Sequence, residues 1–400
     1  MMKKFYLILT CAALCACGGG NKQQATATYE KMEEETTISL PILDLEKKFP
    51  QKVITLQDIA DVEYIVLETH DDGLVGSMNT TITDKFIITY TGMTDQVVFF
   101  HRDGRFSHSF YQKGPSGKEY NAISDLRVNP KLEEIYINDN LTGCIQVYTY
   151  QGEYKRTLKL RGNGYMMGAI FNCDDNSLLV EDWWNVDDEK KKKTNQHPYY
   201  KVSITDGTME QLPLKIENRI RDAFKWQDGE LYGSITTGQS PIAYINDKLI
   251  IADFALDTVY VYQNNQLIPI AVRQNQFKDN EIPLTTSLEV ITDKYYLWHS
   301  VEKDLKKTVL PDKFLLQDRH TGKCIQIKLV DQNIIDKKFR FRREASANTH
   351  TVPKNHALQH YPAYVLIELL EEGKLQGELK EIASKLTEED NPVIMLAKFK

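Results

Sequence analysis

The first residues with a recognisable chemistry are cysteines close to the N-terminus. The run LCAC at 14–17 places a small residue directly before Cys17, which is the pattern of a bacterial lipobox. In such a pattern the cysteine thiol is the nucleophile for lipid attachment, and cleavage makes this residue the new N-terminus. A basic pair at 3–4 and an apolar run at 5–15, too short to span a bilayer, are typical of a signal segment. We therefore expect a signal peptide at 1–16 and a membrane anchor through lipid on Cys17.

The segment at 17–37 is predicted to be a disordered tether. It consists mostly of Gly, Gln, Thr, Ala and Glu, with few large apolar side chains that could build a core. Position 18 is Gly rather than Asp, so the inner-membrane retention signal of enteric bacteria is absent. This favours an outer-membrane lipoprotein of the cell envelope. The acidic residues begin only at Glu30, which leaves open whether the protein faces the periplasm or the cell surface.

The charge and the remaining cysteines exclude some classes of function. The formal net charge is −7, and loss of the two lysines at 3–4 with the signal takes it to −9. An acidic surface argues against nucleic acid as a partner. Only Cys144, Cys173 and Cys324 remain after the N-terminal cysteines, so at most one disulfide can form and a disulfide framework is excluded.

A second group of residues has the chemistry of ligand binding. Aromatic rings pack against the C–H groups of a sugar, and cationic side chains meet anionic groups. The candidates for this role are Lys113, Tyr120, Arg161, Tyr165, Trp183, Trp184 and His299. Each aromatic candidate also has a structural interpretation, because large rings often pack between neighbouring sheets. Whether these residues can act together depends on the elements that position them.

Those elements follow from two sets of tight turns, each flanked by apolar strands. Asp, Asn and Gly favour such turns because they tolerate left-handed backbone conformations. The first set is Thr83-Asp84-Lys85, Asn129-Pro130-Lys131, Asp174-Asp175-Asn176, Asn246-Asp247-Lys248 and Thr292-Asp293-Lys294. The second set is Asp103-Gly104, Gln151-Gly152, Asp206-Gly207, Asn264-Asn265 and Thr321-Gly322. Each period therefore contains four short antiparallel strands, which is the signature of propeller blades.

We predict an all-β fold, a six-bladed β-propeller over residues 38–400. Five blades follow directly from the turns. The sixth is expected to form when a strand at 391–400 pairs with a strand at 60–69, because this pairing closes the ring and removes two free edges. A helical insertion is predicted at 374–390, where apolar residues share one helical face. We expect it to pack across the sixth blade, with docking of a partner as the alternative.

The strand order predicts that the two faces of the ring differ. Both sets of tight turns belong to one face, here called the tight-turn face. The longer connectors belong to the opposite, loop-rich face, and they are expected at 111–120, 161–168, 183–198, 215–238, 273–285 and 301–312. One of them contains a possible short helix at 217–224. Because long connectors are costly to order and often functional, we expect the loop-rich face to bind the ligand.

Three stretches of sequence resemble a known family. The hairpin VVFFHRDGRFSHSF at 97–110, the run QKGPSGKEY at 112–120 and the ending EEDNPVIMLAKFK at 388–400 are similar to six-bladed propeller lipoproteins of Bacteroidota, related to NHL-repeat and TolB-like propellers. Ser116 and Lys118 lengthen a loop that is more compact in that family. The resemblance extends over nearly all the mature chain. It implies the propeller fold and the envelope location, and it implies no particular activity.

The sequence favours a binding module over an enzyme. It contains no Gly-x-Ser-x-Gly nucleophile motif, and its nine histidines are scattered along the chain. We therefore expect a lipid-anchored propeller that binds a protein or a glycan through the loop-rich face. The alternative is a metal-dependent lyase or hydrolase with its site at the mouth of the central channel. Such a site could use Ca²⁺ or a His/Glu pair brought together in space. His299, expected at the end of a strand near the loop-rich face, is the one histidine candidate.

Overall fold

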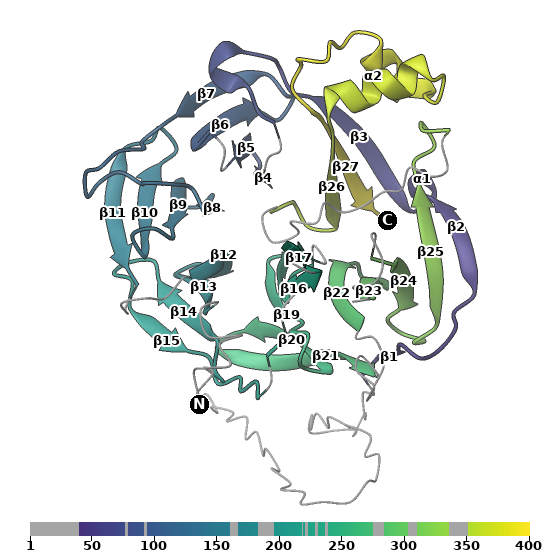
Figure 1. Ribbon diagram of the computed structural model, residues 1–400, viewed down its shortest axis with the longest axis horizontal. Helices are drawn as coiled ribbons and strands as arrows, with labels where there is room; N and C mark the ends of the chain where they lie inside the picture. Colours follow the sequence, from purple (N-terminus) through teal and green to yellow (C-terminus); the bar gives the residue numbers. More distant parts are fainter. Residues whose placement is uncertain are drawn as a thin grey trace, which may run out of the picture. The chain divides into compact units, whose positions relative to one another are not determined.

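The structure is a computed structural model, and it describes residues 40–76, 79–91, 94–160, 167–182, 196–217, 219–220, 223–228, 231–236, 239–274, 284–302, 310–335 and 351–400. The strands of this part of the chain form a ring of six sheets, as Figure 1 shows. The predicted six-bladed β-propeller is therefore confirmed.

Three blades are plain four-stranded antiparallel sheets, with the first strand of each nearest the axis. The first contains β4 (Asn79–Ile82), β5 (Phe86–Thr91), β6 (Gln96–His101) and β7 (Phe106–Phe110). The second contains β8 (Asp125–Asn129), β9 (Glu134–Asp139), β10 (Cys144–Thr149) and β11 (Tyr154–Lys159). The third contains β12 (Met167–Asp174), β13 (Ser177–Asp182), β14 (Tyr199–Ser203) and β15 (Met209–Gln211).

The fourth and fifth blades each gain a fifth strand on the outside. Their own strands are β18 (Ile242–Ile245), β19 (Lys248–Ile251), β20 (Thr258–Gln263) and β21 (Gln266–Gln274), then β22 (Leu284–Ile291), β23 (Tyr295–Glu302), β24 (Asp312–Asp318) and β25 (Cys324–Val330). The added strands are β1 (Ile42–Asp44), parallel to β21, and β2 (Gln51–Thr55), parallel to β25. We call residues 41–59 the N-terminal strap. It covers two sheet edges that would otherwise be open to pairing.

The sixth blade closes the ring as predicted. After the strap and the short helix α1 (Leu56–Ile59), β3 (Ala60–Val66) pairs with the C-terminal strand β27 (Val393–Phe399). The other edge of β27 pairs with β26 (His356–Tyr361), so residues from both ends of the propeller share one sheet. Figure 1 shows the C-terminus beside α1, where the backbone N–H of Lys400 donates to the carbonyl oxygen of Ile59 at 3.0 Å.

The predicted helical insertion is present, and a second helix precedes it. Helix α3 (Gly377–Ala383) lies within the predicted segment, and α2 (Ala363–Glu371) comes before it. Both helices connect β26 to β27, and their apolar side chains pack into the core shared by the fifth and sixth blades. The helices therefore pack across the sixth blade, in agreement with the structural interpretation.

One local prediction is wrong. The possible short helix at 217–224 is not formed, because Ala223 and Phe224 begin strand β16 (Ala223–Asp228), which pairs with β17 (Leu231–Thr236). The two strands form a separate hairpin between the third and fourth blades. The Asp-Gly pair at 228–229 is typical of a hairpin turn, in agreement with the pairing of β16 and β17.

The residues in the tight turns explain why these turns form where the sequence predicts them. Asn246, Asp247, Asn264 and Asn265 all have positive φ angles, between 52° and 59°, which suit two-residue hairpin turns. Gly152 has a φ of 80° and its backbone packs against the side chain of Phe110. All ten predicted turns connect consecutive antiparallel strands of the five blades.

Buried polar contacts lock neighbouring blades together. The carboxylate of Asp125, on β8 of the second blade, accepts hydrogen bonds from the hydroxyl of Tyr90 in the first blade and the backbone N–H of Ile170 in the third, both at 2.8 Å. Arg127 donates to the same carboxylate at 2.7 Å. Burial raises the pKa of the Asp125 carboxyl, and the charge of Arg127 opposes this change. One buried side chain therefore links three neighbouring blades.

Candidate functional site

The two faces of the propeller differ in the way that the turn pattern predicts. On the tight-turn face the longest of the ten predicted connectors span 204–208 and 319–323. By strand order, the connectors on the loop-rich face include 111–124, 183–198, 212–241, 303–311 and 362–392. By strand order, the longer connectors therefore begin and end on the loop-rich face.

Lys113 is the accessible candidate on the loop-rich face. Its side chain is 42% exposed, and its ammonium group lies 2.6 Å from a carboxylate oxygen of the almost buried Asp95. The hydrogen bond to Asp95 raises the pKa of Lys113, so the ammonium stays charged. The other oxygen of Asp95 accepts the backbone N–H of Ile123 at 2.8 Å. Lys113 therefore presents a cation whose position is fixed by the loop.

Tyr120 supports that position from within the fold. Its side chain is fully buried, and its hydroxyl donates to the backbone oxygen of Asp95 at 2.7 Å. The same hydroxyl accepts the backbone N–H of Gln112 at 3.0 Å. The structure thus places Tyr120 beneath Lys113, where its contacts order the connector between the first two blades.

His299 lies on β23 near the loop-rich face, as expected. Its Nε2 atom is 3.2 Å from a carboxylate oxygen of Asp312, and its ring stacks on Phe314 with the centroids 4.5 Å apart. The side chain is 17% exposed. These contacts hold the imidazole between β23 and β24 of the fifth blade. Lys113 follows the last strand of the first blade, so the two candidates belong to different blades.

The other candidates cannot be placed in the site. Arg161, Tyr165, Trp183 and Trp184 lie outside the described residues, as does Cys17. Their predicted roles in ligand binding and lipid attachment stay predictions. In the part of the chain that is described, no helix is long and apolar enough to cross a membrane.

Exposed apolar side chains on the loop-rich face were not anticipated from the sequence. Leu74, Tyr111, Leu141, Ile335 and Tyr364 are all at least half exposed, and all lie in connectors or in the helix α2 of this face. Among the described residues they lie in connectors of the fifth, sixth, first and second blades. Tyr111 and Leu141 are 56% and 75% exposed. In the described connectors these side chains are open to solvent, so a partner on this face could cover them.

No metal site is assembled by the described residues. Among them, no group of three or more His, Cys, Asp and Glu side chains could hold an ion. His356 and His360 are four residues apart, but they lie on strand β26 rather than on a helix, and His360 contacts the hydroxyl of Thr80 at 2.9 Å. The alternative of a metal-dependent lyase or hydrolase at the channel mouth is not tested by these residues.

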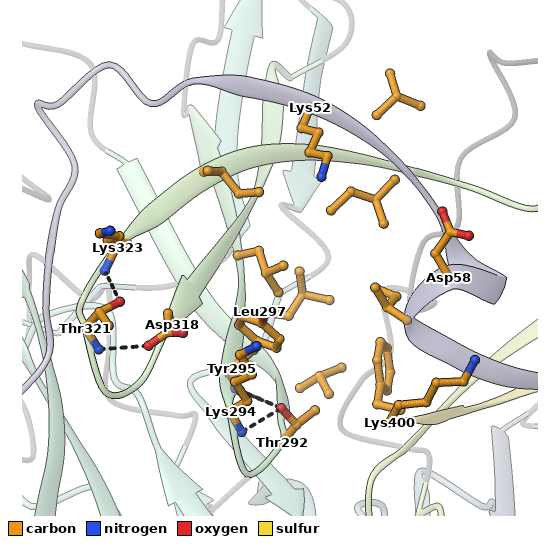
Figure 2. Close-up of a pocket in the computed structure, with 17 residues that line it drawn as sticks. Lys52, Asp58, Thr292, Lys294, Tyr295, Leu297, Asp318, Thr321, Lys323 and Lys400 are labelled. Atoms are coloured by element: carbon orange, nitrogen blue, oxygen red, sulfur yellow. Dashed lines mark hydrogen bonds between the residues drawn. The ribbon is translucent and has the colours of Figure 1, made fainter.

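A cavity of about 560 Å³ lies on the tight-turn face, where no site was predicted (Figure 2). It is bounded by the two tight turns of the fifth blade, by the N-terminal strap and by the end of β27. Its rim carries four lysines and two aspartates, and its floor is apolar. Loop length gave no indication of this cavity, because its walls come from segments that are far apart in the sequence.

The closed ring of six sheets, with its first and last strands in one blade, defines the class of the protein as a six-bladed β-propeller. Within that class the chain belongs to the family described as a domain of unknown function, DUF4934, which matches residues 40–398. No curated protein matches the sequence at a significant level.

Two crystal structures share the fold. One is of a Bacteroides fragilis protein whose name describes it as exported; the TM-score is 0.63 at 12% identity, over 90% of this chain and 99% of the other. The second is of a DUF4221 family member from Bacteroides vulgatus, with a TM-score of 0.51 at 12% identity, over 86% of this chain and 99% of the other. At this level of identity the likeness shows the fold alone.

Proposed function

We propose that this protein is a lipid-anchored binding module of the bacterial cell envelope, which recognises a protein ligand through its loop-rich face. The observation that carries the proposal is the exposure of apolar side chains, among them Tyr111 and Leu141, in the described connectors of that face. Lys113 stands on the same face as a fixed cation, and interfaces commonly combine apolar anchors with charged groups at their rim. The lipobox around Cys17 supports the anchor, and the Bacteroides fragilis protein of like fold, whose name suggests export, supports a location outside the cytoplasm.

The anchor is tested by labelling cells with a fatty acid that carries an alkyne group. The wild-type protein is expected to incorporate the label and to fractionate with the outer membrane, whereas Cys17→Ser is expected to do neither. An unlabelled wild-type protein would refute the lipid anchor. Digestion of intact cells with a protease distinguishes a surface-facing from a periplasmic protein.

The ligand face is tested with a double variant and a matched control. Tyr111→Lys with Leu141→Lys changes two exposed side chains of the loop-rich face, and Leu132→Lys changes an exposed side chain, 49% accessible, on the tight-turn face. Because all three residues are exposed, the fold should tolerate the changes. Each purified protein, with Ser in place of Cys17, is crosslinked to envelope extract and the captured proteins are identified.

We expect wild type and Leu132→Lys to capture the same protein, and the double variant to lose it. Equal capture by all three proteins would refute the assignment of this face. If wild type captures no protein but binds a glycan array, the ligand is a sugar rather than a protein. Binding of the same two variants to the array then shows whether the sugar contacts the loop-rich face.

A further inference from the structure

The cavity on the tight-turn face is a second binding site candidate, separate from the loop-rich face. Figure 2 shows how three segments enclose it. The turns around Lys294 and Lys323 come from the fifth blade, Lys52 and Asp58 come from the N-terminal strap, and Lys400 follows β27. The site therefore exists only when the strap, the fifth blade and the C-terminal strand are all in place.

The floor of the cavity is apolar and belongs to the protein core. Val290, Leu297 and Phe399 line it, and each is 9% exposed or less because the remainder of the side chain packs inside the core of the fifth and sixth blades. Val53 on β2 also lines the cavity, and it is 57% exposed. An apolar side chain that stays in solvent beside a cavity would lose that exposure if an apolar ligand covered it, which favours binding.

The rim of the cavity carries more lysines than aspartates. Lys52, Lys294, Lys323 and Lys400 surround the apolar centre, against Asp58 and Asp318. The carboxylate of Asp318 already accepts the backbone N–H groups of His320 and Thr321, at 3.0 and 2.8 Å, and these bonds lower its pKa. It therefore stays ionised within its own turn.

The lysines differ in how far the fold engages them. Lys400 donates to the backbone oxygen of Gln57 at 3.2 Å and forms an ion pair with Asp61 at 3.4 Å, so its charge is already matched. Lys294 lies 5.0 Å from the ring centroid of Tyr295. Within the described part of the chain, Lys52 and Lys323 have no ion-pair partner. Lysine side chains beside an apolar floor, here Lys52, Lys294 and Lys323, are complementary to a ligand with one anionic group and one apolar body.

We propose that this cavity binds a single-chain amphipathic anion of the fatty-acid type, taken up as a monomer. Its hydrocarbon chain covers the apolar floor, and its carboxylate meets Lys294 and Lys323 at the rim. The volume of about 560 Å³ lies within the range of roughly 300–1,000 Å³ typical of small-molecule pockets. The ligand would contact the strap and the fifth blade together, so its binding also stabilises the attachment of the strap.

The test uses the protein with Ser in place of Cys17 and sodium dodecanoate below its micelle concentration, followed by titration calorimetry. Dodecyltrimethylammonium has the same chain with the opposite charge, and acetate has the same head group without the chain. We expect saturable 1:1 binding of dodecanoate, no comparable binding of the other two, and a higher unfolding temperature with dodecanoate.

The lysines are tested by the double variant Lys294→Gln with Lys323→Gln. Lys85→Gln is the matched control, since Lys85 occupies the same place in the corresponding turn of the first blade but does not line the cavity. We expect the double variant to bind dodecanoate about tenfold more weakly than wild type, because it loses two partly exposed charged contacts. Lys85→Gln is expected to bind dodecanoate with the affinity of wild type. Val53→Asp, which leaves the core untouched, is expected to weaken binding as well.

Four results would overturn the proposal. They are the absence of dodecanoate binding, equal binding of the cationic amphiphile, equal weakening by Lys85→Gln, and association only with vesicles of anionic phospholipid in a sedimentation assay. The last result would mean that the lysines meet a membrane surface rather than a free ligand. None of these results depends on the loop-rich face, so the two proposals fail independently.

Discussion

Replacing Glu134 by Gln measures how strongly a single buried ion-pair cluster holds the second blade. The Glu134 side chain is 3% exposed, and Arg156 donates to its two oxygens at 2.8 and 2.7 Å. Tyr136 donates to it at 2.6 Å, and Lys155 lies 2.5 Å away. Arg156 also donates to the backbone oxygen of Ile204 at 2.8 Å, which links the cluster to the third blade.

The magnitude follows from the pKa of this carboxyl group. Burial by itself would raise the pKa of Glu134, but the hydrogen bonds from Arg156, Lys155 and Tyr136 outweigh burial and lower it from 4.5 to about 2. At about 1.4 kcal/mol per pKa unit this difference has an upper limit near 3 kcal/mol. Because Lys155 and Arg156 are 39% and 26% exposed, solvent screening reduces the contribution to about 2 kcal/mol.

The sign of the pH dependence is fixed by the direction of this change. A carboxyl group with a lowered pKa in the folded state stabilises the fold fully above its unfolded pKa of 4.5, and the contribution disappears as the pH falls from 4.5 towards 2. Glu134→Gln is therefore expected to lower the free energy of unfolding by about 2 kcal/mol at pH 7 and to match wild type near pH 2.

The assay is urea unfolding of both proteins at several pH values, read by circular dichroism and compared as differences so that other acidic groups cancel. Glu133→Gln is the matched control. Glu133 pairs with Lys85 at 2.6 Å, but both side chains are at least half exposed, so we expect a loss below about 0.5 kcal/mol. A difference for Glu134→Gln that stays constant down to pH 2, or a loss no larger than the control, would refute the reasoning.

Two further predictions concern the turns and the thiols. Gly152→Ala is expected to destabilise the protein by more than about 1 kcal/mol and by more than Gly322→Ala in thermal unfolding. Both residues have positive φ angles, but a Cβ at 152 would lie 2.7 Å from Phe110, whereas the space at 322 is open. Burial raises the pKa of Cys173 to about 11 and of Cys324 to about 12, so both thiols should react with a disulfide reagent at pH 8 far more slowly in the folded protein than in urea. Equal cost of the two alanines, or equal thiol rates in both states, would contradict these expectations.

The fold was largely predictable because its turns depend on local chemistry. Asn264 and Asn265 favour positive φ angles by themselves, and this preference marks a hairpin whatever surrounds it. The pairing of β3 with β27 could also be predicted, because two strands without partners at the ends of a repeat array remove their free edges by pairing.

The strap could not be predicted, because its pairings are determined by tertiary contact. Residues 42–44 pair in parallel with 272–274, and neither segment carries a local signal for the other. Helix α2 was missed because its sequence, AYVLIELLE, is nearly as apolar as a buried strand. The hairpin β16–β17 carried a visible signal in the Asp-Gly pair at 228–229, but it lies outside the regular period of the blades.

The candidate sites were harder to predict from the sequence than the fold. The position of Lys113 on the loop-rich face follows from strand order, but its pairing with Asp95 and its support by Tyr120 depend on how one connector folds. The lysines of the cavity could not be singled out, since Lys85 and Lys131 occupy equivalent turns in other blades. What distinguishes Lys294 is the strap and the C-terminal strand beside it, and only the structure shows this arrangement.

The pairing of β3 with β27 also determines when the protein can finish folding. During synthesis β3 is made near the beginning of the propeller and β27 at its end, so β3 must wait for almost the entire chain before its partner exists. Until then β3 is an open edge that other chains can pair with. An export pathway that keeps the polypeptide extended until its last residues have crossed the membrane would avoid this exposure, and ring closure would then be the final step.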